Sequence, residues 1–163
     1  MSSPAVKLLK RILLGLALVF VAIQFVRPAR NVATAPSTND ITARYPTPPA
    51  VKQLLAIACY DCHSNTTRYP WYANVQPMAW WLATHVDDGK RHLNFSEFAA
   101  YAPKKAVVKL EDLADEVNEG EMPLASYRIA HADARLTPEQ RKLLADWADA
   151  VRERILAENG LTE

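Results

Sequence analysis

The sequence predicts an all-α protein, with one small helical domain and a single apolar helix in front of it. Three observations support this prediction. Apolar residues recur at helical spacing, residues that start and stop helices flank these stretches, and no stretch alternates apolar and polar residues as a half-buried strand would. A chain of 163 residues is long enough for one domain and an extension, but short for two domains.

Residues 1–27 are expected to form a membrane anchor or a signal segment outside the folded domain. Residues 12–26 form an almost unbroken apolar run, with three cations before it and two after it. As a helix this run rises about 22 Å, and counting from Leu8 extends it to about 19 residues, close to what a bilayer core requires. The alternative is a signal peptide cleaved after a small-x-small sequence that ends at Ala35. Both cases predict export of the remaining chain.

Charge is divided unevenly along the sequence. The first 35 residues hold five cations and no acid, whereas the remainder holds 14 cations and 18 acids, a net charge of about −4 with neutral histidines. The body of the protein has no basic stripe of the kind that nucleic-acid binding requires, so we expect no nucleic-acid partner. The acidic run between Glu111 and Glu121 is interpreted as a solvated helix face, and a docking patch for a basic redox partner is the alternative.

Residues 28–45 are predicted to be a linker, and residues 46–160 the folded domain. The linker stretch is rich in Pro, Thr, Ala and Asn, which disfavours a helix there. The first domain helix is expected to begin after Pro49 and to run into Cys59. The second helix is expected over 77–88, with Gly89 at its C-terminal end, and a short helical turn over 96–101.

The last two helices have the clearest end signals. The third is predicted over Pro103–Glu119 and stops at Gly120. The final helix begins after Thr137, an N-cap that forms a capping box with Gln140, and Gly160 follows its end. The core face expected for this helix consists of Leu143, Leu144, Trp147, Val151 and Ile155.

The chemistry of the sequence is concentrated in Cys59-Tyr60-Asp61-Cys62-His63. Two thiols separated by two residues and followed at once by a histidine are typical of c-type haem attachment. The spacing lets both sulfurs reach the vinyl groups on one porphyrin edge, and the imidazole then lies beneath the iron. We therefore expect one covalent haem c, held by Cys59 and Cys62, with His63 as an iron ligand.

Other uses of this motif fit the sequence less well. A thioredoxin-type Cys-x-x-Cys follows a strand in a βαβ unit, and no strand pattern precedes Cys59. A structural zinc site requires a second ligand pair, and the sequence has no third cysteine. A plain disulfide across two residues would leave His63 without a role. The aromatic residues that follow the motif, from Trp71 to Tyr101, are expected to pack the domain and to cover one face of the haem.

The second axial ligand is predicted to be Met122. It lies with Pro123 in a loop between two helices, 59 residues beyond His63, and such a loop can bring a thioether to the opposite haem face. His92 is the strongest histidine alternative, and an open sixth position is the other alternative. Three further candidates are interpreted as packing or surface residues: Met78, His85 and His131.

Four sequence blocks carry a family resemblance: Cys62-His63-Ser64-Asn65, Arg68-Tyr69-Pro70-Trp71-Tyr72, His92-Leu93-Asn94-Phe95-Ser96-Glu97-Phe98 and Glu121-Met122-Pro123-Leu124. These blocks resemble the bacterial haem-binding domain family, and the end of the chain is similar to the C-terminal part of class I cytochromes c. The resemblance covers about residues 40–150. It implies a small, exported, all-α protein with a single covalent haem, led by one hydrophobic segment, and it implies no particular reaction.

Three classes of function remain open. His/Met ligation fills both axial positions, which favours an electron carrier on the periplasmic side of the membrane. A peroxidase-like enzyme would require a displaceable sixth ligand and an acid–base group such as His92, and a gas or redox sensor would release Met122. We expect a single-pass inner-membrane protein, or a soluble periplasmic one after cleavage near Ala35. The expected partners are the cytochrome c maturation machinery and redox proteins that the sequence does not identify.

Overall fold

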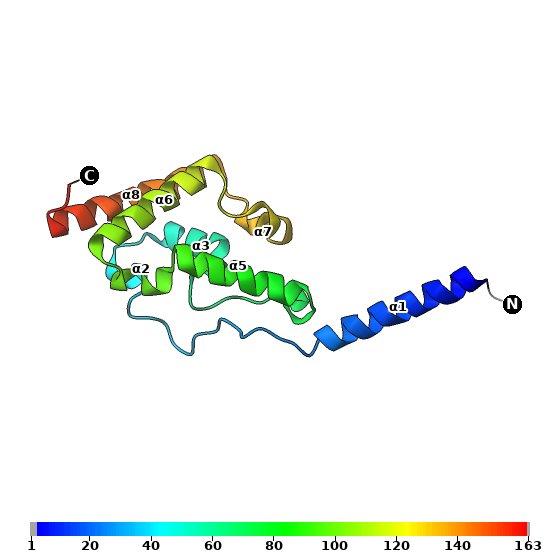
Figure 1. The fold of residues 1–163 in the computed structure, drawn as a ribbon. Helices are drawn as coiled ribbons and strands as arrows, with labels where there is room; N and C mark the ends of the chain where they lie inside the picture. The colour runs from blue at the N-terminus through cyan, green and yellow to red at the C-terminus, as the bar shows by residue number, and fades with distance from the viewer. Residues whose placement is uncertain (1–2, 163) are drawn as a thin grey trace. The chain divides into compact units, whose positions relative to one another are not determined.

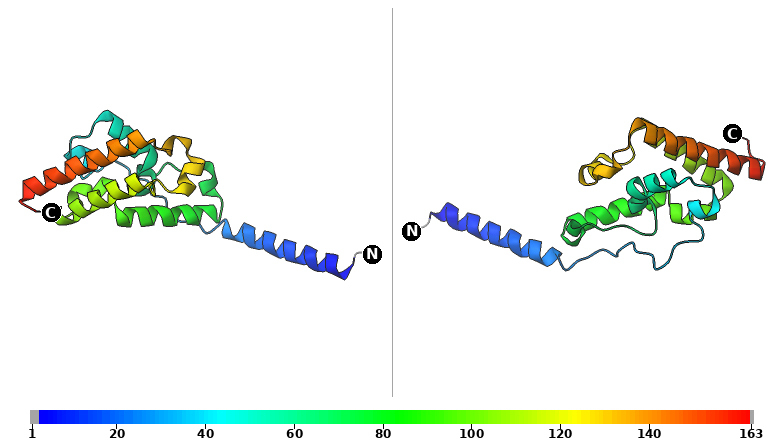
Figure 2. Two further views of the ribbon diagram at one scale, coloured as in Figure 1. Left: turned by 90° about the horizontal axis from the view of Figure 1, so that it is seen from above. Right: turned by 180° about the vertical axis from the view of Figure 1, so that it is seen from behind.

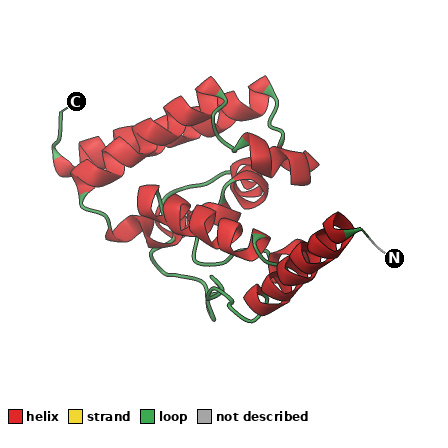
Figure 3. Ribbon diagram, turned by 45° about the vertical axis from the view of Figure 1, so that its right-hand side comes forward, coloured by secondary structure: helices red, strands yellow, loops and turns green. Residues whose placement is uncertain are grey.

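The computed structural model describes residues 3–162, and its regular elements are helical (Figure 3). Within this described range there is no strand, and one isolated antiparallel bridge joins Val32 and Thr66. The all-α prediction is therefore confirmed. The chain divides into two compact units. The first unit comprises Met1–Arg30 and Arg68–His85, and the second unit comprises Asn31–Thr67 and Val86–Glu163.

The first unit contains α1 (Pro4–Ile23), η1 (Trp71–Asn74) and the beginning of α5 (Met78–His92). Proline at the first helical position favours the start of α1, because its missing N–H would have no partner there. No residue of α1 is buried, and most of its large apolar side chains are about half exposed or more. Among the helices of residues 3–162, none is both long enough and apolar enough to cross a membrane.

The second unit contains the remaining elements: α2 (Ile41–Arg44), α3 (Pro49–Ala58), α4 (Tyr60–His63), the end of α5, η2 (Phe95–Ala100), α6 (Pro103–Glu119), α7 (Ala125–Ala130), η3 (Ala132–Ala134) and α8 (Pro138–Asn159). The long helices α6 and α8 pack side by side, as Figure 1 and both views of Figure 2 show. Apolar side chains from α3, η2, α6 and α8 form one buried core between these helices. Its largest members, Phe95 and Phe98, come from η2.

The predicted ends of α6 and α8 are confirmed. Gly120 closes α6 in the left-handed region at φ 80°, and Gly160 closes α8 at φ 59°, conformations that favour glycine. Thr137 and Gln140 form both hydrogen bonds of the capping box at the start of α8. The core face predicted for α8 is wrong at one position, because Leu143 is 39 % exposed while its neighbour Leu144 is fully buried.

Two boundaries differ from the sequence-based expectation. The second helix is longer than predicted, since α5 passes Gly89 and ends at His92. Gly89 serves a steric role instead, since a Cβ atom there would lie 2.6 Å from the backbone oxygen of Cys62. The stretch expected to be a linker is partly folded into the domain. Asp40 caps α2 by accepting the Thr42 N–H, and Ile41 is completely buried in the core.

Candidate functional site

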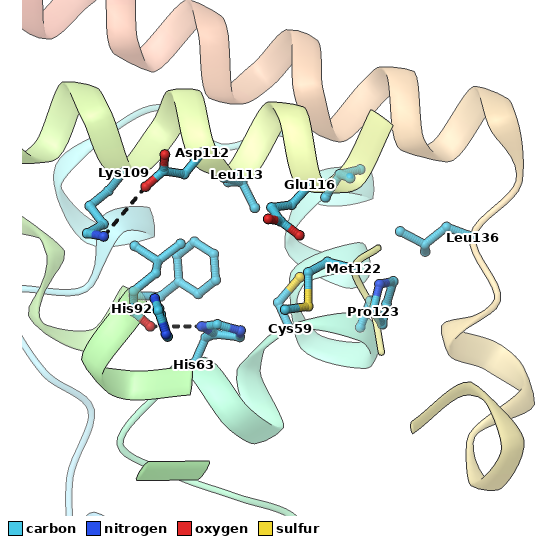
Figure 4. A pocket seen from close by; sticks show the side chains of 14 residues that line it. Cys59, His63, His92, Lys109, Asp112, Leu113, Glu116, Met122, Pro123 and Leu136 are labelled. Atoms are coloured by element: carbon cyan, nitrogen blue, oxygen red, sulfur yellow. Dashed lines mark hydrogen bonds and ion pairs between the residues drawn. The ribbon is translucent and has the colours of Figure 1, made fainter. Parts of the chain in front are cut away.

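The second unit contains a cavity of about 440 Å³, a size typical of ligand sites. Its walls come from the α3–α4 junction, from η2 and the residues before it, from one face of α6, and from the loop that carries Met122 (Figure 4). Three of the four residues predicted to hold the haem line this cavity, namely Cys59, His63 and Met122. The lining is mostly apolar, with Phe95, Leu113 and Val117 among its residues.

His63 is held in one orientation by its neighbours. Its Nδ1 atom lies 2.9 Å from the backbone oxygen of Leu93, so the N–H is on Nδ1 and the lone pair is left on Nε2. The imidazole packs edge to face against Phe95, with 6.3 Å between the ring centres. Burial lowers the pKa of His63, which favours the neutral ring that a metal requires. The ring extends into the cavity with Nε2 available as a ligand (Figure 4).

The two cysteines have different positions. Cys59 joins α3 to α4 and lines the cavity beside Met122 (Figure 4). Cys62 lies one helical turn further on and is half-buried, and it is not among the described residues that line the cavity. Both thiols are free. Burial is the main reason why the pKa of Cys59 is raised to about 12 and that of Cys62 to about 11. The neighbouring Cys62 adds to the first shift and Asp61 adds to the second. Both thiols are therefore protonated at neutral pH.

Met122 is positioned by the end of α6. Its backbone N–H donates to the oxygen of Glu116 at 3.1 Å, across the left-handed turn at Gly120. A Cβ atom at Gly120 would meet only the flexible end of the Arg141 side chain, so it is the left-handed φ that favours glycine at this turn. Met122 is half-buried against the core, and its thioether faces the cavity (Figure 4). The loop therefore brings Met122 to the cavity.

The alternative ligands are distributed unequally. His92 lines the same cavity and stays a competitor for the sixth position. Met78 and His85 belong to the first unit, where His85 packs on Trp81 with 4.1 Å between ring centres. His131 stacks on Tyr127 with 4.0 Å between ring centres.

Sequence reasoning missed one wall of the site. Asp112 and Glu116 are exposed, as expected of a solvated acidic face, and both also line the cavity with Lys109 of the same helix. Lys109 pairs with Asp112 at 3.5 Å, and the Glu116 carboxylate points into the cavity (Figure 4). The spacing of 109, 112 and 116 places these side chains on one helix face, which is the signal that could have identified them.

A hydrogen bond from α7 to the Cys-x-x-Cys-His turn was also not predicted. The hydroxyl of Tyr127 donates to a carboxylate oxygen of Asp61 at 2.7 Å, and it lies 3.2 Å from the backbone oxygen of Ile57. Asp61 is one of the two residues between the cysteines and is only 6 % exposed. Tyr127 thereby joins α7 to the Cys-x-x-Cys-His turn, and no local pattern predicts that contact.

The aromatic residues after the motif divide into two groups. Phe95 and Phe98 are buried in the second unit, and Phe95 lines the cavity as expected. The expectation that the tryptophans also pack the domain is wrong for Trp71 and Trp81 of the first unit, because Trp71 is 78 % exposed and Trp81 is 41 % exposed.

The residues around the cavity fit a haem. An imidazole with a fixed lone pair and a thioether, both groups that can ligate haem iron, lie with the Cys59 thiol around a mostly apolar space. The model of the family described as "Haem-binding domain" matches residues 18–150, most of the chain. No curated protein and no solved structure matches the sequence. The family match and the cavity lead to one conclusion: the chain belongs to the haem-binding domain family and binds haem.

Proposed function

We propose that the protein carries one haem c and transfers electrons on the periplasmic side of the membrane. Cys59 and Cys62 would hold the haem by thioether bonds, and His63 and Met122 would ligate the iron. The observation that carries this proposal is the single cavity that brings Cys59, His63 and Met122 together, with the Nδ1 atom of His63 tied to Leu93. When bound, the haem supplies a one-electron couple, whose potential His/Met ligation raises.

The cysteines act in this proposal as covalent clamps. Cys59 and Cys62 would each hold the haem through a thioether bond to one vinyl group, whose other carbon would take the thiol hydrogen. Cys62 would have to turn its sulfur toward the cavity that Cys59 lines. The test is acid–acetone extraction of protein made with the cytochrome c maturation machinery. We expect haem to stay with the wild-type chain and to be extracted from Cys59→Ser/Cys62→Ser, and extraction from both would contradict covalent attachment.

Ligation of the iron by Met122 would distinguish an electron carrier from an enzyme or a sensor. In the oxidised wild-type protein we expect the weak long-wavelength band typical of Fe–S(Met) ligation, with low-spin spectra in both oxidation states. Met122→Ala should lose this band, and the matched change Met78→Ala in the first unit should leave it intact. A band that survives in Met122→Ala would contradict the ligand assignment.

An enzyme or a sensor is the second candidate, and the carboxylate of Glu116 favours it. Glu116 lies in the cavity near Met122, where an acid–base group would be needed if that ligand were displaced. His92 lines the same cavity. High-spin ferric spectra in the wild-type protein, or carbon monoxide binding to the reduced form without loss of fold, would favour this candidate over the carrier.

Anchoring by α1 is part of the proposed function. The helix exposes large apolar side chains on all sides, and the apolar run continues past its end to Val26. Lys7, Lys10 and Arg11 can extend toward lipid headgroups from the first half of the helix. We expect the full-length protein to remain in the membrane fraction after a carbonate wash, with an intact N-terminus. A soluble product that begins near residue 36 would favour a cleaved signal peptide.

A further inference from the structure

The two units differ sharply in charge. The first unit contains six of the 19 Lys and Arg residues and no Asp or Glu. The second unit contains the other 13 cations and all 18 acids. Acidic residues are thus missing from two stretches, 1–30 and 68–85, that are far apart in sequence and form one compact unit. A surface with cations and no acids fits an anionic partner.

The first unit also exposes aromatic and aliphatic side chains outside α1. Phe25 is 84 % exposed, Trp71 is 78 % exposed and Val26 is 60 % exposed, and Trp81 adds a partly exposed ring. Large exposed apolar side chains grouped in this way mark a contact site. Tryptophan is enriched where one side of its ring meets apolar chains and the other meets water, which is the environment of a bilayer interface.

A hydrogen-bond network ties the end of α1 to this aromatic segment. Gln76 is 1 % exposed, and its backbone N–H donates to the side-chain oxygen of Gln24 at 2.9 Å. The Gln76 side chain donates to the oxygen of Val26 at 2.8 Å, and the indole of Trp80 donates to the same oxygen at 3.0 Å. Residues 24–26 are therefore part of the folded structure of the first unit, and removing them would leave the buried Gln76 without these partners.

We propose that the first unit is a membrane-contact surface for an anionic phospholipid bilayer. Residues 25–30 and 68–85 would lie in the headgroup layer, beside the point where α1 enters the bilayer. Trp71 and Trp81 would sit between headgroups and acyl chains, and Arg27 and Arg30 would contact lipid phosphates. This inference extends the proposed function beyond haem chemistry and rests on the proposed anchoring by α1.

Charge and continuity favour a bilayer over a second copy of the chain. Two copies of residues 25–30 and 68–85 would bring six cations together without a compensating acid, since each copy holds Arg27, Arg30 and Arg68, and this disfavours self-association. The exposed segment is hydrogen-bonded to Gln24 and Val26, directly after the end of an apolar helix that itself has no buried residue. One planar occupant, a bilayer with negative headgroups, accounts for both the apolar helix and the cationic aromatic segment.

The test uses the full-length holoprotein in two kinds of lipid nanodisc, one of phosphatidylcholine and one that also contains phosphatidylglycerol. We measure amide hydrogen exchange of residues 70–76 by mass spectrometry. Because α1 enters both discs, a difference between them reports the surface alone. We expect slower exchange of the wild-type protein in the anionic disc than in the phosphatidylcholine disc. Arg27→Gln should make this difference in exchange rate about fivefold smaller, and Trp71→Ala should make it smaller still. High salt should abolish the slowing.

Matched controls lie in the second unit. Ile129 is 79 % exposed, as Trp71 is, and the Lys142 side chain is 75 % exposed, so Ile129→Ala and Lys142→Gln should leave the exchange unchanged. Equal exchange in both discs would overturn the membrane surface while leaving the anchor intact. Slowing that follows protein concentration in phosphatidylcholine discs would identify a second copy as the partner and would overturn the proposal. Failure of the chain to enter either disc would overturn the anchor and the surface together.

Discussion

The two units use the same kinds of side chain in opposite ways. The second unit buries Phe95, Phe98 and the facing leucines of α6 and α8, and it places most of its charges on the outside or at the cavity, with Asp61 as a buried exception. The first unit exposes Phe25 and Trp71, and it buries Gln76 instead. A buried amide needs partners, whereas a buried leucine needs only close packing. The comparison shows that the second unit is stabilised by its own core and the first by a few specific hydrogen bonds.

The sharpest test of this comparison is one chemical change made in each unit. Leu110 of α6 is fully buried and Leu16 of α1 is 61 % exposed. We expect Leu110→Ala to lower the free energy of unfolding by about 2–5 kcal/mol, because it removes apolar contact and leaves a cavity. Leu16→Ala should change it by less than about 0.5 kcal/mol. Denaturant unfolding in detergent, followed by circular dichroism, measures both, and equal effects would contradict the division.

The contact between α7 and the haem motif gives the next largest effect. Tyr127→Phe removes the hydrogen bond to Asp61, which is only 6 % exposed. A hydrogen bond to a carboxylate contributes about 1.5–3 kcal/mol, so we expect a loss of that order in the free energy of unfolding. Tyr72→Phe in the first unit is the control, with an expected change near zero. A loss no larger than that of Tyr72→Phe would show that the Tyr127 hydroxyl does not stabilise the Cys-x-x-Cys-His turn.

The first unit has its own sensitive residue in Gln76. We expect Gln76→Ala to cost about 1–3 kcal/mol of local stability, since it leaves polar groups of Val26 and Trp80 with fewer partners. The effect should appear as faster amide exchange at the start of α5, while α8 keeps its protection. Gln53→Ala, at an exposed position of α3, is the matched control. Loss of protection in α8 would mean that the two units unfold together.

The smallest expected effect concerns a helix end in the second unit. Thr137→Ala removes the side-chain acceptor of the capping box of α8. N-cap replacements of this kind cost about 1 kcal/mol. Thermal unfolding of the holoprotein measures the loss, and Thr137→Ser should restore most of it because serine also accepts the Gln140 N–H. An equally unstable serine variant would show that the methyl group, and not the cap, stabilises this end.

Local signals explain which parts of the fold were predictable. The ends of α6 and α8 follow from Gly120, Thr137 and Gly160, which act within one helical turn. The short helices α2 and α7 were not predicted, because distant contacts stabilise them, such as the hydrogen bond from Tyr127 to Asp61. The prediction of a helix end at Gly89 is wrong, because this glycine is required for close approach to the backbone of Cys62, 27 residues earlier in the chain.

The candidate site, too, combines features that follow from local sequence with features that depend on distant contacts. The Cys59–His63 motif is contiguous, so its residue types and spacing were enough to predict it. The contribution of α6 to the cavity was not predicted. Its acidic residues are exposed as expected, and only the tertiary structure shows that Asp112 and Glu116 also line the cavity. The hydrogen bond from His63 to Leu93 links residues 30 apart and belongs to tertiary structure.

The contact between Gly89 and the backbone of Cys62 has a consequence for the conditions under which the site keeps its shape. Glycine lets the two segments approach closely, because a Cβ atom at position 89 would lie 2.6 Å from the Cys62 oxygen. This steric limit involves no charge that salt could screen and no proton that acid could add. The shortest distance that α5 and the haem motif can reach is therefore the same at ionic strengths and pH values that weaken ion pairs such as the one between Lys109 and Asp112.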